Sequence, residues 1–340
     1  MKKILVMGGA GYVGSVLAPK LLDLQYSVRV ADTFWFGDDL IDLCAKRPGR
    51  VSAQASFWKT DLRNCNLEPL MEDVDTVIHL ACISNDPSFE LNSKLGRSIN
   101  YDAFLRVLDA SIEAKVRRFI YASSSSVYGI KGGDVEVTED LSLEPITDYS
   151  KFKTFCEMEL RMVPQDKMEW VVLRPATVCG WSPRLRLDLT VNILTLSALT
   201  KKKITVFGGT QKRPNIHIED MADLYIRLLN EPREKICGKI FNAGVDNLTI
   251  TQIAEMVKDV VEGYGIGPIE IETTPTDDLR SYHVSSEKIR RELGWAPKFG
   301  VEDAVRDLCD AYLDGKIQDP SNEKYYNIKV MQKLLKEGKV

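Results

Sequence analysis

The chain has 340 residues, more than one ordinary core holds, so we expect one large domain and a smaller lobe. Hydrophobic residues make up 44%, charged residues 28%, and the formal net charge is −4. These values describe a soluble globular protein without the positive surface that binds polyanions. We therefore expect no nucleic-acid partner.

The cysteines and histidines indicate a reducing compartment and no structural metal. The seven cysteines are scattered without a C-x-x-C pair, and neither a signal peptide nor an apolar run of membrane-spanning length is apparent. We expect a cytoplasmic protein with no membrane partner. His79, His217 and His283 have no ligand spacing, so packing is the favoured role for each.

The N-terminal segment predicts a dinucleotide site. An apolar strand over residues 4–6 leads into a glycine loop, and a helix is expected over residues 15–24. Gly9, Gly11 and Gly14 satisfy the G-x-G-x-x-G spacing, in which missing Cβ atoms let a pyrophosphate approach backbone N–H groups and the helix N-terminus. The expected cofactor contacts in the loop are Gly8, Gly11, Tyr12, Val13 and Gly14.

The residue after the second strand selects the cofactor. A strand over residues 27–31 ends in Asp32, whose carboxylate can accept hydrogen bonds from both hydroxyls of an adenosine ribose. A 2′-phosphate would meet that negative charge, and Thr33, Phe34 and Trp35 supply no arginine to receive it. The sequence therefore predicts NAD rather than NADP.

Alternating strands and helices follow. Apolar runs over residues 75–81 and 116–122 are typical of buried parallel strands, and residues 100–114 carry helical periodicity. Ligands bind beyond the carboxyl ends of such strands, so Ser84 and Asn85 are candidate substrate contacts. Asp61, after residues 51–60, either meets an adenine edge or caps the next segment, and both interpretations stay open.

The catalytic pattern comes next. A serine run, residues 123–126, ends the strand over 116–122, and Tyr149 and Lys153 stand at i and i+4 where another helix begins. An ammonium beside a phenol, reinforced by the positive nicotinamide of an oxidised cofactor, stabilises phenolate and lowers a pKa normally near ~10. Tyr149 is therefore predicted to act as the base, with a serine hydroxyl holding the substrate oxygen.

The chain resembles an extended short-chain dehydrogenase/reductase, specifically the nucleotide-sugar epimerases and dehydratases typified by UDP-galactose 4-epimerase. The resemblance covers nearly the whole length. Two departures are Met7, where the family usually has threonine, and Cys179, where it usually has tyrosine. The matching residues are the glycine loop, Asp32, Asp61-Leu62-Arg63, His79-Leu80-Ala81, Asn100, the serine run with Val127-Tyr128-Gly129, Tyr149, Lys153 and Arg174-Pro175.

The resemblance implies an α/β fold, with a Rossmann-type doubly wound parallel sheet and a smaller C-terminal substrate-binding lobe. Residues 1–176 and 215–245 would form the NAD-binding domain, and residues 177–214 and 246–340 the nucleotide-sugar-binding lobe.

The resemblance also implies roles for single residues. Ser124 takes the position of the catalytic Ser/Thr, and Asp61, Leu62, Leu80, Ala81, Asn100, Tyr149 and Lys153 join the glycine loop and Asp32 around NAD. The nucleotide diphosphate sugar would contact Ser84, Asn85, Ser125, Thr177, Asn192, Arg213 and Arg280. Arginine suits a diphosphate because its planar fork binds phosphate oxygens bidentately.

Several reactions share a first oxidation of a sugar hydroxyl by NAD. Dehydratases of the family carry an Asp-Glu pair after the catalytic serine and decarboxylases a glutamate, whereas this chain has Ser125 and Ser126. Epimerisation, with C4 as the favoured carbon, is therefore the expected outcome. A 4-ketoreductase is the alternative, although such enzymes usually prefer NADPH, which Asp32 opposes; an NAD-sensing regulator would lose the catalytic trio. The sugar, the nucleotide base and the carbon stay open.

The family commonly forms homodimers through two paired helices, here residues 100–114 and 150–161. Each offers apolar residues, part of which must pack on the chain's own sheet: Phe104, Val107 and Leu108 on the first, and Phe152, Phe155 and Leu160 on the second. We expect a homodimer. The polar tail, residues 317–340, has no predicted role beyond a last helical stretch.

Overall fold

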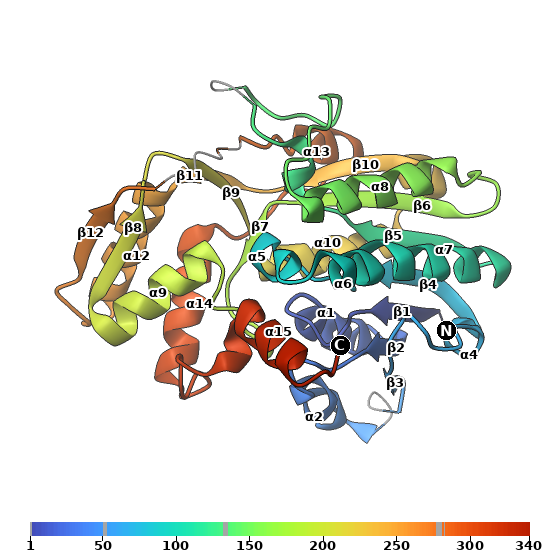
Figure 1. Ribbon diagram of the computed structural model, residues 1–340, viewed down its shortest axis with the longest axis horizontal. Coiled ribbons are helices and arrows are strands. Elements are labelled where there is room, and N and C mark those ends of the chain that lie inside the picture. Colours follow the sequence, from blue (N-terminus) through green and yellow to red (C-terminus); the bar gives the residue numbers. More distant parts are fainter. Residues whose placement is uncertain (1, 50–52, 132–134, 277–280, 282) are drawn as a thin grey trace.

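A computed structural model describes residues 2–49, 53–131, 135–276, 281 and 283–340. Its largest element is a sheet of seven strands in the order β10-β6-β5-β4-β1-β2-β3, and every neighbouring pair is parallel (Figure 1). This confirms the Rossmann-type doubly wound sheet. In chain order the strands are β1 (Lys3–Met7), β2 (Ser27–Asp32), β3 (Ala55–Lys59), β4 (Val74–His79), β5 (Arg118–Ala122), β6 (Glu169–Pro175) and β10 (Lys239–Ala243).

Helices cover both faces of this sheet because its strands are apolar on both sides. In β1, Ile4 and Val6 pack with α1 (Gly14–Asp23) and α10 (Ile218–Asn230). Leu5 and Met7 point to the opposite face, against α7 (Ala103–Glu113) and α8 (Asp148–Met162).

Shorter segments complete the connections of the large sheet. A π-helical turn, Ser98–Asp102, runs directly into α7 and contains the buried Asn100. Other segments of the described chain are α2 (Asp39–Ala45), α4 (Glu68–Met71), α5 (Asp86–Glu90), α6 (Ser93–Arg97), the 3-10 turn Ser125–Tyr128 and α11 (Arg233–Ile236).

A smaller group of elements lies beside the large sheet, at the left of Figure 1. It contains a three-stranded sheet in the order β11-β9-β7, a parallel pair of β12 and β8, and three helices, α9, α12 and α14, that pack on one another. Their bounds are β7 (Thr177–Cys179), α9 (Thr190–Lys201), β8 (Lys203–Phe207), β9 (Lys212–His217), β11 (Asp246–Thr249), α12 (Ile250–Gly263), β12 (Glu270–Thr274) and α14 (Val301–Leu313).

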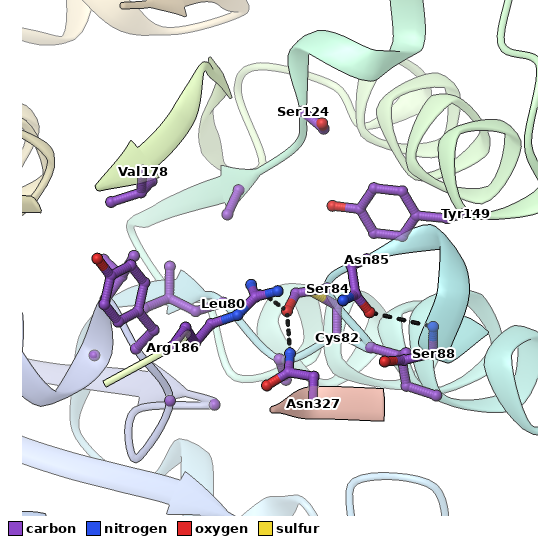
Figure 2. Close-up of a pocket in the computed structure, with 18 of the residues that line it drawn as sticks. Leu80, Cys82, Ser84, Asn85, Ser88, Ser124, Tyr149, Val178, Arg186 and Asn327 are labelled. Carbon is purple, nitrogen blue, oxygen red and sulfur yellow. Dashed lines mark hydrogen bonds between the residues drawn. The ribbon is translucent and has the colours of Figure 1, made fainter. Parts of the chain in front are cut away.

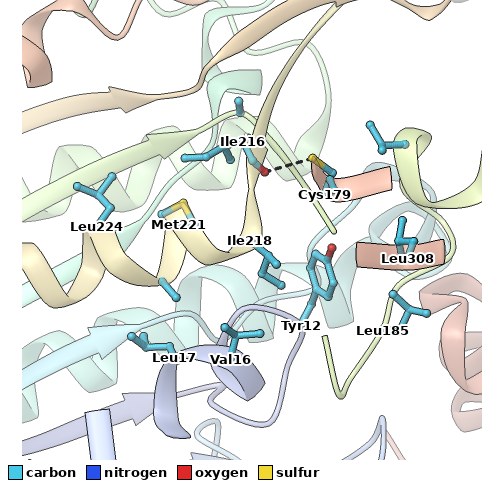
Figure 3. Close-up of a cluster of buried hydrophobic side chains, with 14 of the residues drawn as sticks. Tyr12, Val16, Leu17, Cys179, Leu185, Ile216, Ile218, Met221, Leu224 and Leu308 are labelled. Atoms are coloured by element: carbon cyan, nitrogen blue, oxygen red, sulfur yellow. Dashed lines mark hydrogen bonds between the residues drawn. The ribbon is translucent and has the colours of Figure 1, made fainter. Parts of the chain in front are cut away.

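One apolar cluster joins the two groups of elements (Figure 3). Val16 of α1 and Met221 of α10 belong to the same cluster as Ile216 of β9 and Leu308 of α14. Cys179 lies inside it, with its Sγ 3.5 Å from the carbonyl oxygen of Ile216. The departure from tyrosine at residue 179 is therefore a packing feature.

The C-terminal part of the chain returns to the large sheet. Helix α13 (Glu287–Leu293), within the range expected for the substrate lobe, packs against β10. A 3-10 turn (Glu323–Tyr325) and α15 (Asn327–Lys336) follow, and α15 packs against α5, placing the tail beside the carboxyl end of β4.

All seven cysteines are free thiols. Among the described residues, no helix combines the length and apolar character needed to cross a membrane. The same residues contain no cluster of three or more His, Cys, Asp or Glu side chains arranged to hold a metal ion. His79 instead packs on Phe104 and Phe119, and His217 caps α10 by accepting the N–H of Glu219.

Candidate active site

A cavity of about 430 Å³ lies at the carboxyl ends of the strands of the large sheet. Its walls come from the glycine loop, the ends of β2, β4 and β5, the start of α8, β7 and α15. The predicted site residues that line it are Gly8, Gly11, Tyr12, Val13, Gly14, Asp32, Asp61, Leu62, Leu80, Ala81, Ser84, Asn85, Ser124, Ser125, Tyr149, Lys153, Thr177 and Arg213.

The glycine loop is tight for steric reasons. Gly8 has φ +74°, and a Cβ there would lie 2.6 Å from the Cα of Ala81. Gly14, the first residue of α1, has no room for a side chain because the carbonyl of Gly9 faces it. Gly9 itself packs between Val30 and Val6 and does not line the cavity. Of the adjacent residues Gly8 and Gly9, only Gly8 therefore faces the cavity.

Asp32 is held at the end of β2 by backbone groups. Its carboxylate accepts the N–H of Ala10 at 2.9 Å and of Phe34 at 2.8 Å. Burial raises its pKa, while these two N–H groups act in the opposite direction. With an acidic residue at the β2 end and an open helix N-terminus beyond the glycines, the residues present fit NAD.

Asp61 belongs to a turn rather than to a helix cap. Its carboxylate is bound by the guanidinium and the backbone N–H of Arg63, and its backbone carbonyl accepts from the N–H of Cys65. Asp61 lines the cavity beside Leu62, and its contact with the adenine stays a prediction. The capping alternative is wrong, because the next helix, α4, begins after Leu67.

Helix α8 presents Tyr149 and Lys153 to the cavity. Thr147 and Ser150 form a capping box that starts the helix at Asp148, so residues one turn apart on one face reach the same space. The ammonium of Lys153 donates to the carbonyl of Ala122 at 2.6 Å and lies 5.8 Å from the centroid of the Tyr149 ring.

The lowering of the Tyr149 pKa by Lys153 together with a bound oxidised nicotinamide stays a prediction. Burial raises this pKa to about 12, although Lys153 acts to lower it and Ser124 acts in the same direction as Lys153. Lys153 acts in the predicted direction, but the burial of the Tyr149 ring acts against it and is the larger effect. Burial also acts to lower the pKa of Lys153, but Cys82 and Tyr149 raise it, so the ammonium stays charged.

Ser124 faces Tyr149 across the cavity, and both side chains project into it in Figure 2. The Ser124 hydroxyl accepts the N–H of Ser126 at 3.1 Å and the Ser126 hydroxyl at 2.9 Å. These bonds leave the Ser124 hydroxyl hydrogen available for a substrate oxygen.

Buried charges behind the cavity fix helix α8. Glu157, on the same face as Lys153, accepts from Arg174 of β6 at 3.0 and 2.6 Å and from the Ser123 hydroxyl. Arg174 also donates to the Tyr128 hydroxyl at 2.7 Å, and both charged residues are at most 1% exposed. Arg174 therefore ties the catalytic helix to the strands.

Two predicted contacts lie elsewhere. Asn192 does not line the cavity: its amide is fully buried and bonds to the Tyr12 hydroxyl and to the backbone of Gly180 and Arg186. Asn100 likewise bonds the backbone N–H and carbonyl of Ile83, at 2.7 and 3.0 Å. Both residues position loops of the site. The predicted contact Arg280 lies outside the described residues.

A polar network that was not predicted from the sequence crosses the cavity. Arg186 pairs with Asp188 at 2.9 Å and donates to the Ser84 hydroxyl at 3.0 Å, and Asn327 of α15 donates to the same hydroxyl at 3.1 Å (Figure 2). Asp188 also accepts from Asn85 at 2.9 Å.

The sequence did carry a signal for part of this network. Residues 184–189 alternate charged and leucine side chains, and Leu185 and Leu187 are buried in the core while Arg184, Arg186 and Asp188 line the cavity. Such a period of two indicates an extended segment with one polar face. No comparable pattern indicates that Asn327 and Met331 of α15 reach the cavity.

These features define a class of protein. A buried tyrosine with an adjacent ammonium and a serine hydroxyl, beside a glycine loop and an acidic β2 end, suits the transfer of a proton and a hydride between an alcohol and a nicotinamide cofactor. The site is therefore that of an NAD-dependent enzyme acting on a hydroxyl-bearing substrate.

Comparison with known proteins identifies the family. The model of the NAD dependent epimerase/dehydratase family matches residues 4–244, and the chain belongs to this family. An uncharacterised UDP-glucose epimerase of Bacillus subtilis, YtcB, is 32% identical over 270 residues, covering 76% of this chain and 82% of the relative. The UDP-glucose 4-epimerase of Lactobacillus helveticus is 28% identical, covering 89% and 94%.

Solved structures agree with this assignment. The UDP-glucuronic acid 4-epimerase of Bacillus cereus, in complex with UDP-glucuronic acid and NAD, superposes with a TM-score of 0.79 at 27% identity, over 92% of this chain and 99% of that chain. A UDP-N-acetylglucosamine 4-epimerase of Methanobrevibacter ruminantium gives a TM-score of 0.80 at 22% identity, over 92% and 98%, and shares the fold.

Proposed function

We propose that the protein is an NAD-dependent nucleotide-sugar epimerase that inverts C4 through a transient keto-sugar. The observation that carries the proposal is the meeting of Ser124, Tyr149 and Lys153 in the cavity that the glycine loop and Asp32 line. The names of the relatives, several of them UDP-sugar 4-epimerases, support the same reaction.

The cavity carboxylates near Tyr149 also favour epimerisation. Dehydration and decarboxylation need a further acid or base, yet the residues after Ser124 are Ser125 and Ser126. Asp86 accepts from the Thr147 hydroxyl at 2.6 Å, and Asp188 is engaged by Arg186. Since no acid or base follows Ser124 and these two described carboxylates already have partners, rotation of the keto-sugar and reduction of its other face is the simplest outcome.

Each catalytic residue has a distinct task in this proposal. Bound NAD supplies the reversible acceptor for the hydride. Tyr149 removes the proton of the sugar hydroxyl and later returns it, Ser124 holds that oxygen by a hydrogen bond, and Lys153 stabilises the phenolate. We also propose a set of side chains that contact the sugar nucleotide: Ser84, Asn85, Ser125, Thr177, Arg213 and Arg280. In the proposed division of the chain, residues 1–176 and 215–245 hold NAD, and residues 177–214 and 246–340 hold the sugar nucleotide.

The reaction is testable without knowing the sugar. Purified protein is incubated with UDP-, GDP-, CDP- and dTDP-sugars without added cofactor, and the products are separated by chromatography and identified by NMR. We expect one sugar nucleotide to be converted to its C4 epimer, with the same equilibrium mixture reached from either epimer. Consumption of one reduced cofactor per product would replace the epimerase by a ketoreductase, and loss of water would replace it by a dehydratase.

We further propose that the protein is a cytoplasmic homodimer that pairs through α8. Phe155, Met158 and Met162 form a stripe on α8 and are 42%, 57% and 80% exposed. This stripe differs from the predicted one, because Phe104, Val107, Leu108 and Leu160 pack in the chain's own core and Phe152 is half-buried. The free thiols of all seven cysteines support a reducing cytoplasm.

Light scattering at micromolar concentration checks the dimer. We expect twice the chain mass of 38.3 kDa for the wild type and a single chain mass for the Phe155→Glu/Met158→Glu variant, because two charges in the stripe oppose association. Leu313→Glu, on an equally exposed leucine at the end of α14, should stay dimeric. A monomeric wild type would reject the homodimer.

A further inference from the structure

Arg184 is the one described arginine of the cavity wall whose buried N–H groups have no acceptor. It is 6% exposed, and its Nε and Nη1 have no hydrogen-bond partner within the part of the chain that the structure describes. Its Nη2 donates to Asn327 of α15, and its guanidinium lies 4.0 Å from the centroid of the Phe36 ring. A buried cation with unsatisfied donors is costly unless a ligand supplies the anion.

Neighbouring charges do not supply that anion. Asp188 is paired with Arg186 and Asn85, and Asp32 is paired with the backbone of Ala10 and Phe34. No carboxylate within the described ranges lies within salt-bridge distance of Arg184. Burial, followed by the nearby Arg186, lowers the pKa of Arg184 to about 9, so the guanidinium is still protonated at neutral pH.

The loop that carries Arg184 is bonded directly to the glycine loop. The Tyr12 hydroxyl donates to the carbonyl of Gly180 at 2.6 Å, and the Ser182 hydroxyl donates to the carbonyl of Tyr12 at 2.8 Å. Arg184 follows Ser182 by two residues, and Phe36 follows Asp32 by four. These bonds hold the loop of Arg184 against the glycine loop, and Arg184 lies near enough to Asp32 and Tyr12 for both to act on its pKa. In such folds the diphosphate of a dinucleotide lies at the glycine loop and the helix N-terminus.

We propose that Arg184 binds the diphosphate of NAD from the opposite wall of the cavity, and that Asn327 of α15 is the positioning residue that aims it. The inference rests on the proposed use of NAD. Backbone N–H groups of the glycine loop would contact one side of the diphosphate and the guanidinium the other. The open Nε–H and Nη1–H groups can each donate to a phosphate oxygen of the diphosphate while Nη2 stays bonded to Asn327. Arg184 and Asn327 would then be exceptions to the proposed division of the chain, because they lie in the ranges assigned to the sugar nucleotide but contribute to the cofactor site.

Calorimetric titration of nucleotide-free full-length protein with NAD, ADP, adenosine and UDP tests the proposal. Arg184→Gln should weaken the binding of NAD and ADP by on the order of 10- to 100-fold, as expected for a lost hydrogen bond to a charged group. The affinities for adenosine and UDP should stay within about twofold of the wild-type values. Arg184→Lys keeps the charge without the Nε–H and Nη1–H donors, and should lose less affinity for NAD and ADP than Arg184→Gln does. Arg306→Gln, on an arginine 51% exposed on α14, is the matched control and should change none of the four.

Asn327→Ala gives an independent check on the positioning role. It should weaken ADP by less than Arg184→Gln does, and the double variant should bind ADP no more weakly than Arg184→Gln alone, because Asn327 acts through Arg184. In urea, nucleotide-free Arg184→Gln should unfold at no lower concentration than the wild type, since a buried charge has been removed.

The failures are distinguishable. A wild type that binds neither NAD nor ADP would remove NAD from the proposed function. A wild type that binds both, with Arg184→Gln binding ADP equally well, would overturn only the role of Arg184. If Arg184→Gln binds UDP more weakly but ADP as tightly as the wild type, the guanidinium contacts the substrate instead. If the variant loses equal affinity for ADP and adenosine, the role of Arg184 is structural. Either result rejects the proposal.

Discussion

Tyr149→Phe is expected to lower turnover by roughly 10² to 10⁴-fold, the usual contribution of a positioned acid or base, while the Kd of the sugar nucleotide changes little. The variant removes only the hydroxyl oxygen of a side chain that lines the cavity opposite Ser124. Initial rates at saturating substrate and equilibrium titration of the sugar nucleotide measure the two quantities separately.

Tyr101→Phe is the matched control for that experiment. The Tyr101 hydroxyl donates to Glu159 of α8, the helix that carries Tyr149, at 2.8 Å. Tyr101 does not line the cavity, so the loss of its hydroxyl should leave turnover within about twofold of the wild type. Ser124→Ala should retain weakened activity. Wild-type turnover in Tyr149→Phe would reject Tyr149 as the base.

The pH dependence of turnover is expected to follow from the pair Tyr149 and Lys153. Burial raises the pKa of Tyr149 to about 12 and Lys153 acts against this shift, so removing the ammonium in Lys153→Ala should raise the phenol pKa further. Because the phenolate is the active form, the rising limb of the pH–rate profile should move to higher pH. The profile is recorded at saturating NAD, since Lys153→Ala is also expected to weaken the cofactor.

Glu157→Gln is expected to lower the free energy of unfolding by about 3–5 kcal/mol, because it leaves Arg174 as an uncompensated buried charge. Glu157 and Arg174 are 1% and 0% exposed, and two hydrogen bonds join them. Although burial acts to lower it, the pKa of Arg174 is raised by Glu157 and the Tyr128 hydroxyl, so the guanidinium cannot escape the cost by losing its proton near neutral pH. Urea unfolding of the nucleotide-free protein measures the change.

A surface pair and a double variant control this prediction. Glu302→Gln breaks an exposed i,i+4 pair with Arg306 on α14 and should cost no more than about 1 kcal/mol. Glu157→Gln/Arg174→Met should be less destabilised than Glu157→Gln alone, because no unpaired charge stays buried. Equal effects of Glu157→Gln and Glu302→Gln would contradict the role given to the buried pair.

Short-range patterns made the cofactor site and the catalytic pair predictable. The order strand, glycine loop, helix, strand and Asp32 is local, and the spacing of Tyr149 and Lys153 is one helical turn. These features depend on backbone geometry that a few neighbouring residues determine. The structure accordingly has all of them lining one cavity.

The residues that could not be predicted depend on distant contacts. Asn192 has the polarity of a ligand contact, but its amide bonds Tyr12, from which it is separated by 180 positions. The Tyr149 pKa depends on burial by segments that sequence spacing does not describe. The bond between Asn327 and Ser84 could not be predicted from the sequence, because only the completed fold brings α15 to the carboxyl end of β4.

The bond between Asn327 and Ser84 spans 243 positions of the chain, so the wall it completes exists only in the fully folded protein. Given the proposed contact of Arg184 with NAD, we expect a partly folded chain that has formed the glycine loop but lacks this wall to bind the dinucleotide less tightly. A ligand that binds the native state but not the unfolded state raises the free energy of unfolding by mass action. At a free ligand concentration of 100 Kd the increase is about 2.7 kcal/mol. We therefore expect the fraction of this chain that escapes unfolding and proteolysis to rise with the concentration of dinucleotide, in addition to its use in the reaction.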